Sequence, residues 1–330
     1  MIDTPHALCL LSGGLDSLLS VRVLREQGLR ITGITFETPF FGSMRAEMAA
    51  RALDIPHRVL DITDDHLEMV KGPQYGYGRN MNPCIDCHAM MFRKAGDLMD
   101  ELKAQFLFSG EVLGQRPMSQ NLRALQTVEK ASGYAGLILR PLSARLLPET
   151  DPEKKGLVDR SRLLDIQGRS RKRQMELAEE WGISEFPSPG GGCLLTDPGF
   201  SIRLRELLMV DPRSTSLDVE RLKVGRHFRM PGGGKAIVGR NHQENEQLRE
   251  LGREGDHFLK CLEATGPLAL LEEGASPEDA ELTASLVVRY GKTLGKEGPV
   301  PVKVEGGEGE ERVIFALPAN RDDLEKYRVG

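Results

Sequence analysis

The alternation of apolar and periodic segments in the first half of the chain restricts the fold more than any other feature of the sequence. Short apolar segments predict strands, and the segments between them have the spacing of amphipathic helices. The predicted strands are Ala7–Leu11, Arg30–Phe36, His57–Asp61, Phe106–Ser109 and Leu137–Leu139, and the predicted helices include Leu18–Glu26 and Ala46–Leu53. Strands that alternate with helices indicate βαβ units, so we expect an α/β fold with a doubly wound parallel sheet. Ligands of such sheets bind beyond the carboxyl ends of the strands.

The alternating pattern fades near Arg145, and a different pattern follows it. Leu147–Asp159 is rich in charge and predicts a surface loop, and Met175–Trp181 predicts a helix. The later predicted elements are helices at Ile202–Met209, Glu244–Leu251 and Pro277–Gly291, strands at Val219–Met230 and Ala236–Val238, and a hairpin of Val300–Val304 with Arg312–Leu317. We therefore expect two domains, one over residues 1–200 and a smaller α+β domain over residues 215–330.

The composition favours a cytoplasmic protein without a membrane segment. The amino terminus carries an acid and no Lys or Arg before the first apolar run, unlike a secretory signal. No apolar run approaches the roughly 18 residues that cross a bilayer. Because thiols stay reduced in the cytoplasm, the five cysteines indicate chemistry or metal binding more than disulfides. The net charge of −5 argues against a uniformly basic nucleic-acid binder but permits a local basic patch. The sequence leaves open whether the chain forms a homodimer.

A glycine-rich hexapeptide, Ser12-Gly13-Gly14-Leu15-Asp16-Ser17, lies between the first predicted strand and the first predicted helix. The two glycines let the backbone approach a phosphate, and the serine hydroxyls and free helix N–H groups donate to it. The short spacing and the missing Lys distinguish the segment from a Walker A loop. Asp16 would repel a phosphate unless a cation intervened, so we assign this residue to Mg²⁺. The alternative is a plain glycine turn with a serine cap.

The hexapeptide resembles that of the PP-loop ATP pyrophosphatases, which have a HUP-like fold and activate a carbonyl oxygen as an adenylate. Three further segments, Gly110–Gln115, Ser119-Gln120 and Arg140-Pro141-Leu142, are similar to the adenylation domain of tRNA 4-thiouridine synthases. The resemblance implies that Arg140 meets a phosphate and that Phe36 contacts adenine. The implied ATP-binding residues are Ser12, Gly13, Gly14, Asp16, Ser17, Phe36, Gly110, Glu111, Gln115 and Arg140. The alternative is that Glu111 caps a loop and Arg140 forms a surface ion pair.

Three cysteines stand out because of their spacing. Cys84 and Cys87 form a C-x-x-C in a predicted loop after Asn82-Pro83, and Cys193 follows three glycines about a hundred residues later. Thiolates are soft ligands that suit zinc or iron–sulfur clusters. Three cysteines hold three irons of a cubane and leave the fourth iron free to bind an exogenous sulfide. Cys9, on the first strand, and Cys261 lack a partner motif and are predicted core residues.

Other interpretations of these cysteines compete with a cluster. The segment from Cys84 to His88 has the pattern of a c-type haem attachment site. A structural zinc would need a fourth ligand, and His88 is a poor one because adjacent residues seldom both point inward. Free thiols that carry a persulfide are a third interpretation. The arrangement is similar to that of the [4Fe–4S]-dependent tRNA thiolases with a PP-loop, and this resemblance implies that Cys84, Cys87 and Cys193 hold the cluster and act in catalysis with Asp16.

Two segments predict contact with RNA. Between Arg160 and Arg173 the chain has six basic residues against a single acid, Asp165, and such a patch can contact several phosphates. The alternative is a solvated helix face. The segment Gly225–Asn245 and much of the chain beyond it resemble the RNA-binding domain of NFACT proteins, which implies that this part docks the RNA in place of the amino-terminal RNA-docking domains of 4-thiouridine synthases. The predicted RNA-binding residues are Arg169, Arg171, Lys172, Arg173 and Arg240.

Together these features predict an ATP-dependent tRNA thiolase. In that interpretation the enzyme uses ATP, Mg²⁺ and a [4Fe–4S] cluster to adenylate a uridine carbonyl and replace its oxygen with sulfur, as in 4-thiouridine formation. Its partners would be tRNA and either sulfide or a sulfur-donor protein. One alternative is a PP-loop enzyme that amidates or inserts sulfur into a small molecule. Another is a non-enzymatic RNA-binding factor that binds ATP as a ligand.

Overall fold

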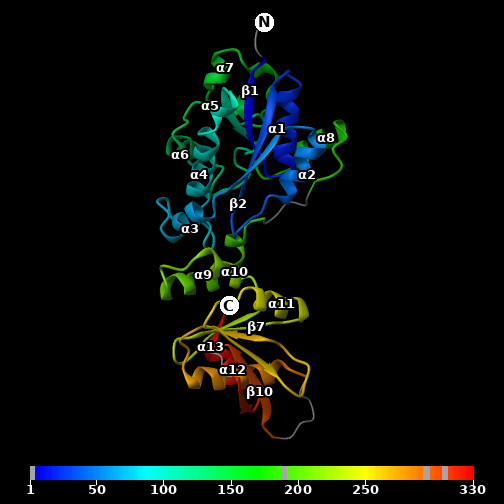
Figure 1. Ribbon diagram of the computed structural model, residues 1–330. Coiled ribbons are helices and arrows are strands. Elements are labelled where there is room, and N and C mark those ends of the chain that lie inside the picture. The colour runs from blue at the N-terminus through cyan, green and yellow to red at the C-terminus, as the bar shows by residue number, and fades with distance from the viewer. Residues whose placement is uncertain (1–3, 187–191, 293–297, 307–310) are drawn as a thin grey trace. The chain divides into compact units, whose positions relative to one another are not determined.

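The computed structural model describes residues 4–186, 192–292, 298–306 and 311–330 of the chain. It consists of two compact units, Met1–Thr196 and Asp197–Gly330, which we call the first unit and the second unit (Figure 1). The sequence had placed a predicted helix at Ile202–Met209 between two domains. In the structure this helix is α9 (Pro198–Val210), and it belongs to the second unit.

The first unit is built on a parallel sheet whose five strands have the order β3-β2-β1-β4-β5. The strands are β1 (His6–Leu10), β2 (Arg30–Glu37), β3 (His57–Asp61), β4 (Phe106–Ser109) and β5 (Ile138–Leu139). Every pairing is parallel, and β1 lies between β2 and β4 with Ala7 opposite both Ile31 and Phe106. The predicted parallel sheet of an α/β fold is therefore confirmed.

Helices cover both faces of this sheet (Figure 1). Residues of α1 (Leu15–Arg25), α2 (Met44–Leu53) and α8 (Lys172–Glu180) share one core with Ala7 and Cys9 of β1. Residues of α4 (Cys84–Gly96) and α6 (Leu122–Ser132) share the other core with Leu8. Successive β1 side chains thus point to opposite cores, because a strand has a period of two. The shorter helices are α3 (Thr63–Lys71), α5 (Met99–Leu102) and α7 (Asp151–Lys154).

The second unit is built on an antiparallel sheet of the order β11-β10-β8-β9-β7-β6-β12. Its strands are β6 (Arg226–Arg229), β7 (Lys235–Val238), β8 (His257–Cys261), β9 (Ala269–Leu271), β10 (Val300–Gly306), β11 (Arg312–Ala316) and β12 (Arg328–Val329). Helix α12 (Pro277–Tyr290) packs on the sheet through Ala284 and Val287, and α11 (His242–Glu250) packs through Leu248. The predicted hairpin is confirmed, since β10 and β11 pair with Val300 opposite Ala316. The remaining helices are α9, α10 (Ser216–Arg221) and α13 (Arg321–Tyr327).

Three local predictions were wrong, each because a helix begins where the sequence suggested another structure. The predicted strand Val219–Met230 starts inside α10, which begins with a capping box between Thr215 and Asp218. The predicted loop Leu147–Asp159 contains α7, whose capping box joins Thr150 and Glu153. The C-x-x-C is not in a loop but opens α4, directly after Pro83, which lacks the N–H that a helix start leaves unpaired.

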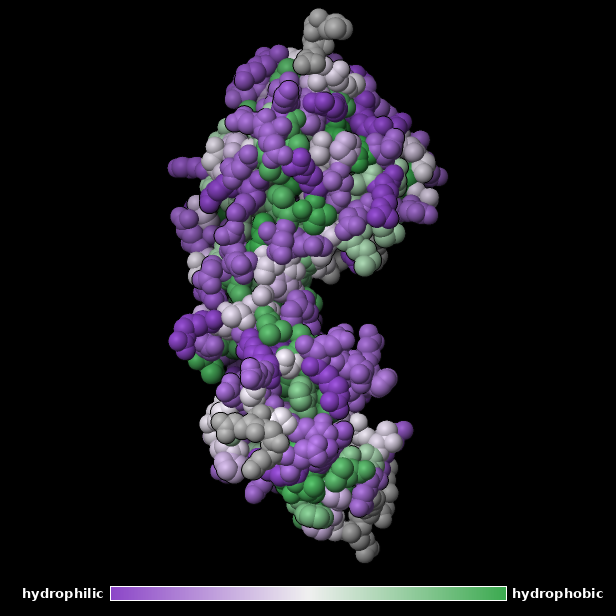
Figure 2. Space-filling model, viewed as in Figure 1, coloured by the Kyte–Doolittle hydropathy of each residue, from purple (hydrophilic) through white to green (hydrophobic). Residues whose placement is uncertain are grey.

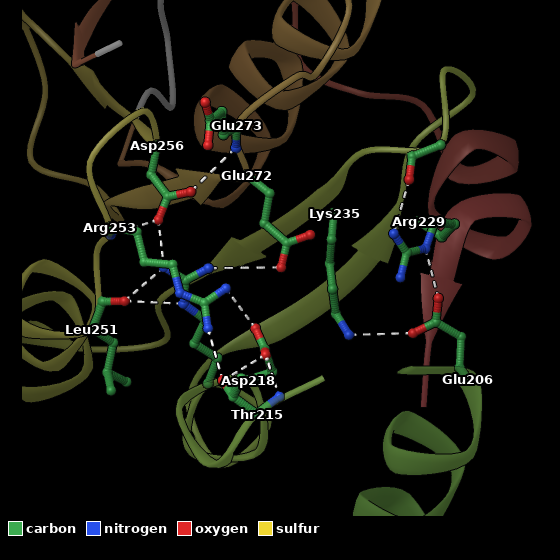
Figure 3. Close-up of polar contacts among 12 residues, drawn as sticks. Glu206, Thr215, Asp218, Arg229, Lys235, Leu251, Arg253, Asp256, Glu272 and Glu273 are labelled. Atoms are coloured by element: carbon green, nitrogen blue, oxygen red, sulfur yellow. Dashed lines mark hydrogen bonds and ion pairs between the residues drawn. The ribbon is translucent and has the colours of Figure 1, made fainter. Parts of the chain in front are cut away.

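Ion pairs fasten α9 to the sheet of the second unit, as Figure 3 shows. Glu206 of α9 accepts from Arg229 Nε of β6 at 2.6 Å and from Lys235 Nζ of β7 at 3.2 Å. Deeper in the unit, buried Arg221 pairs with Asp256, which also accepts from the backbone N–H of Arg253 at 2.7 Å. A buried charge is tolerated when such partners replace its water. The contacts of Glu206 explain why α9 belongs to the second unit.

The visible surface and the polarity of the described helices are the two observations that bear on a membrane segment. The visible face of each unit in Figure 2 is mostly hydrophilic, with apolar residues in smaller patches. Within the described ranges, none of the helices combines the length and the low polarity that crossing a bilayer requires.

Candidate nucleotide and cysteine site

The strand order of the first unit creates one topological switch point, between β1 and β4. From β1 the chain proceeds to β2 and β3 on one side, whereas β4 and β5 lie on the other. Ligands of open α/β sheets bind in the crevice that such a reversal leaves at the carboxyl ends of the strands. The hexapeptide follows β1, and Gly110 to Gln115 follow β4. The two segments predicted to bind ATP thus meet at the position where this fold binds ligands.

Close backbone packing explains two glycines of this region. Gly13 has a φ of +73°, and a Cβ there would collide with the backbone of Arg45 in α2. A Cβ on Gly110 would lie 2.5 Å from Ser17 N in the first turn of α1. Ser17 Oγ donates to Gly14 O at 2.7 Å, and Gly14 N donates to Ser12 Oγ at 3.3 Å. The loop is therefore compact, and the first turn of α1 lies against the loop after β4.

Asp16 is joined to two glutamines from other parts of the first unit. Gln115 Nε2 donates to Asp16 Oδ2 at 2.8 Å, and Gln174 Nε2 of α8 donates to Gln115 Oε1 at 3.4 Å. Asp16 Oδ1 and Gln174 Oε1 are buried and have no hydrogen-bond partner among the described residues. Oxygen atoms of this kind fit the preference of Mg²⁺ or of the water molecules that it keeps. The donor set at Asp16 is therefore suited to the predicted cation.

Glu111 is the centre of a second buried network. Its carboxylate accepts from His88 Nδ1 at 2.7 Å and from Arg140 Nε at 3.0 Å, and Arg140 also pairs with Glu129. Burial alone would raise the pKa of Glu111, but Arg140 and His88 outweigh it and lower the pKa to about 2. Glu111 is thus ionised at neutral pH, and its carboxylate holds the side chains of Arg140 and His88 in place.

The side chains of Arg140 and Phe36 are more enclosed than the sequence suggested. Arg140 is 2% exposed, and its guanidinium is occupied by Glu111, Glu129 and the carbonyl oxygen of Leu125. Phe36 is 4% exposed and packs in the core beneath α4. Their contacts with a phosphate and with adenine stay predictions.

The cysteines gather around the start of α4. Cys84 is its first residue and Cys87 lies one turn further, so both thiols are near the helix amino terminus. Backbone hydrogen bonds join the segment after Cys193 to the rest of the first unit, since Leu194 N donates to Phe40 O at 3.0 Å and Met81 N donates to Leu195 O at 3.3 Å. These bonds bring Cys193 close to a pair that is far away in sequence.

Burial and neighbouring thiols raise the pKa values of Cys87 and Cys193. Burial raises the pKa of Cys87 well above its usual range, and the neighbouring Cys193 and Cys84 raise it further. Burial likewise raises the pKa of Cys193 to about 11 and raises the pKa of Cys84. His66 Nε2 of α3 lies 3.3 Å from Cys87 Sγ, and the imidazole is fully buried against Phe40 and Phe41. Burial lowers the pKa of His66 to about 4, so the ring is neutral at neutral pH.

By chemistry and by location these thiols suit a soft metal. Three cysteines in one neighbourhood are the donor set that the sequence predicted for a cluster. In the described part of the chain, however, no group of three or more His, Cys, Asp or Glu side chains is arranged to hold a metal ion. The donor types therefore fit, whereas the side chains as placed do not surround a common point. Cys9 is buried in a core of the first unit and Cys261 in a core of the second unit, which confirms their predicted packing role.

Comparison with known families assigns each unit separately. Residues 4–145 match the family described as "Thiamine biosynthesis protein (ThiI)", and residues 225–328 match the "NFACT protein RNA binding domain". The first unit carries a ThiI-type PP-loop domain, and the second carries an NFACT-type domain.

Curated relatives match the ThiI-type domain. The tRNA-specific 2-thiouridylase MnmA of Dehalococcoides mccartyi is 32% identical over 117 residues, which are 31% of this chain and 32% of the relative. MnmA 1 of Fusobacterium nucleatum is 27% identical over 180 residues, 51% of this chain and 47% of the relative. The chain thus spans about a third to a half of the length of these relatives.

Solved structures are similar over part of the chain. A 4-thiouridine synthetase–RNA complex with bound ATP is 21% identical, with a TM-score of 0.35 over 53% of this chain and 50% of that chain. A predicted subunit of a tRNA methyltransferase from Methanocaldococcus jannaschii is 19% identical, with a TM-score of 0.35 over 53% of this chain and 76% of that chain.

The residues predicted to bind RNA differ in how free their charges are. In the first unit, beyond the segment that matches ThiI, Arg169 and Lys172 are exposed, and neither forms an ion pair within the described ranges. Arg173 is held by Glu176 and Glu180 at 3.2 and 3.1 Å. Arg171 is half-buried, and its Nε has no partner in the described part of the chain. In the NFACT-type domain, Arg240 pairs with Glu244 at 2.6 Å.

Three residues of the ThiI-type domain were not predicted as site residues. His66 contacts Cys87, His88 contacts Glu111, and Gln174 contacts Gln115. No sequence spacing relates His66 to Cys87 or Gln174 to Gln115, because their proximity arises from helix packing. The position of His88 directly after Cys87 was a weak signal of a functional role, but from the sequence we weighed it only as a metal ligand.

Proposed function

We propose that the chain is an ATP-dependent sulfurtransferase that thiolates a uridine of tRNA. The ThiI-type domain and the 2-thiouridylases that match it support the reaction class. The NFACT-type domain supports an RNA substrate. Its cysteine chemistry requires reduced thiols, which is consistent with a reaction in the cytoplasm.

One contact carries the proposal more than any other. His88 of α4 binds Glu111, which follows β4 beside the hexapeptide, through Nδ1 and Oε1 at 2.7 Å. Because His88 is the neighbour of Cys87, this contact fastens the helix that starts with the cysteines to the predicted nucleotide loop. A base activated at that loop would therefore lie near thiol chemistry, as sulfur transfer to an adenylate requires.

In the proposed reaction the uridine carbonyl oxygen attacks the α-phosphorus of ATP. A new O–P bond forms and the bond to pyrophosphate breaks. Ser12–Ser17 would bind the pyrophosphate through backbone N–H groups and hydroxyls, and the Asp16 carboxylate would hold the Mg²⁺ that neutralises the phosphate charge. Sulfide then adds to the activated carbon, the C–O bond breaks, and AMP departs with the former carbonyl oxygen. The chain supplies position and charge at both stages.

We further propose that Cys84, Cys87 and Cys193 hold a [4Fe–4S] cluster. Such a cluster with three protein ligands would supply an open iron for sulfide from solution or from a donor protein. The rise that Cys84 and Cys193 cause in the pKa of Cys87, and that Cys84 causes in the pKa of Cys193, supports the closeness of the three thiols. His66 would donate from Nε2 to the Cys87 sulfur and keep that ligand in one orientation.

Nucleoside analysis tests the proposal. Anaerobically purified protein is incubated with unmodified tRNA, ATP, Mg²⁺ and sulfide, and the digested RNA is separated and weighed by mass spectrometry. We expect 4-thiouridine that requires ATP. Formation of 2-thiouridine, the product named by the relatives, would correct the position on the base but keep the reaction class. If the protein binds both ATP and tRNA but the digested tRNA contains no thionucleoside, the proposed function is refuted.

A further inference from the structure

We propose that Gln174 is a positioning residue for the metal-binding carboxylate of Asp16. It acts through Gln115 and leaves its own amide oxygen available to the hydrated cation. The inference rests on the proposed function, because it assumes that Asp16 binds the Mg²⁺ of ATP. It extends the site beyond the segment with family similarity, which ends at residue 145.

Gln174, Gln115 and Asp16 form a chain of two hydrogen bonds, which we call the relay. The donors and acceptors of these side chains allow one orientation of each amide. An ionised carboxylate only accepts, so Gln115 must present its NH₂ group to Asp16 Oδ2, at 2.8 Å. The Gln115 oxygen then faces the other way and must accept. Gln174 meets it with its own NH₂ group, at 3.4 Å. The order of donors and acceptors therefore engages the NH₂ group of Gln174 and leaves its Oε1 without a partner.

The two ends of this relay are unpaired acceptors. Asp16 Oδ1 and Gln174 Oε1 are both buried from solvent, and no described residue donates to either atom. A buried polar atom without a partner destabilises the fold, because it has lost its hydrogen bonds to water without replacement. A Leu of similar size at position 174 would avoid this cost, so the glutamine is unfavourable for the fold alone. Polar groups that break such a local rule are expected at functional sites.

The placement of Gln174 follows from the packing of α8 on α1. Gln174, Leu177 and Ala178 share one face of α8, with spacings of three and four residues, and all are buried. Leu177 and Ala178 join the core that α1 and β1 form. Gln174 lies near the amino terminus of α8, so this face continues from the core to the first turn of α1, where Asp16 lies. Helix packing thus aims Gln174 at the hexapeptide.

The test compares Gln174→Leu with the wild-type chain and with Met175→Leu, a control at an exposed neighbour on the same helix. Binding of ATP is measured by calorimetry with Mg²⁺ and with EDTA, and the melting temperature is measured in parallel. We expect Gln174→Leu to weaken Mg²⁺-dependent ATP binding by about tenfold, as removal of a residue that orients a metal ligand does. Metal-free ATP binding and the melting temperature should stay at or above wild-type values. Met175→Leu should change neither.

The outcomes separate the relay from the proposed function. Equal Mg²⁺·ATP affinity for Gln174→Leu and wild type would refute the relay and leave the proposed function intact. A wild-type chain that binds no ATP would defeat both. If Gln174→Leu does not fold, Gln115→Leu breaks the same relay at a half-buried position. Wild-type Mg²⁺·ATP affinity in that folded variant would equally overturn the inference, whereas a similar tenfold loss would support it.

Discussion

Both units pair buried charges, as Glu111 pairs with Arg140 in the first unit, but among the described residues the buried carboxylate and amide oxygens without a partner lie in the first unit. In the second unit Arg221 pairs with Asp256, and Lys235 pairs with Glu206, so buried charges meet buried or half-buried partners. In the first unit, Asp16 Oδ1 and Gln174 Oε1 are buried without a partner in the described part of the chain. The first unit leaves these atoms unpaired near a topological switch point, whereas the second unit uses its charges to join α9 and α10 to the sheet.

This difference distinguishes a site from a scaffold. Paired buried charges hold elements in one arrangement, and removal of one partner leaves the other desolvated. Unpaired acceptors destabilise the fold and are retained where a ligand completes them. We therefore expect substitutions at Asp16 and Gln174 to affect chemistry more than stability. Substitutions in the second-unit network should do the reverse.

The largest expected effect is that of Asp16→Ala. Without the Asp16 carboxylate the Mg²⁺ of ATP would lose its protein ligand. We therefore expect the rate of pyrophosphate release to fall by at least about 100-fold. The melting temperature should stay near that of the wild type, because Asp16 lies at the start of α1 and not in the core. Asp64→Ala, at an exposed position of α3, is the control. A wild-type rate of pyrophosphate release in Asp16→Ala would show that the hexapeptide was assigned wrongly.

Substitution of the cysteines should abolish sulfur transfer. Protein purified without oxygen should contain roughly four irons per chain. Cys84→Ala, Cys87→Ala and Cys193→Ala should each lose this iron together with thiolation, whereas Cys9→Ala and Cys261→Ala should keep both. Iron analysis and nucleoside analysis on the same preparations provide the measurement. Colourless protein with stoichiometric zinc would favour a structural zinc, and full thiolation without iron would rule out the cluster.

Asp256→Ala should have the largest effect on stability alone. It leaves the buried guanidinium of Arg221 without its main partner, which costs about 3–5 kcal/mol and should appear as earlier unfolding of the second unit in urea. ATP binding by the first unit should not change. Glu325→Ala removes an exposed ion pair with Arg321 and serves as the control, with an expected cost below about 1 kcal/mol. Equal unfolding of both variants would contradict the buried network as a stabilising element.

Smaller effects are expected for basic residues that contact RNA phosphates. Arg169→Ala and Lys172→Ala should each weaken tRNA binding a few-fold and reduce the slope of log affinity against log salt by about 1. Arg173→Ala and Arg240→Ala should have less effect, because acids already occupy these guanidinium groups. Filter binding over a range of salt concentrations measures the slopes. If Arg240→Ala has the larger effect, the second unit supplies the dominant phosphate contacts.

The sequence alone determined the class of the sheet and the positions of the hexapeptide and of the second loop that we predict to bind ATP. Period-two and helical patterns are local, so the strands from β1 to β5 and their parallel order of connection were readable from the first half of the chain. The starts of some helices were harder to predict from the sequence. The capping box at Thr215 and Asp218 starts α10 within a segment whose apolar residues suggested a strand.

Contacts between distant segments were decided only by the tertiary structure. Cys193 approaches Cys84 and Cys87 because the chain after it binds the backbone of Phe40 and Met81. Gln174 reaches the relay to Asp16 because α8 packs on α1. Neither pairing leaves a periodic or spaced signal, since each depends on the relative placement of elements that are separated by up to about 150 residues. Chemistry-bearing residue types can therefore be recognised in the sequence, whereas their partners become visible only when the helices are packed.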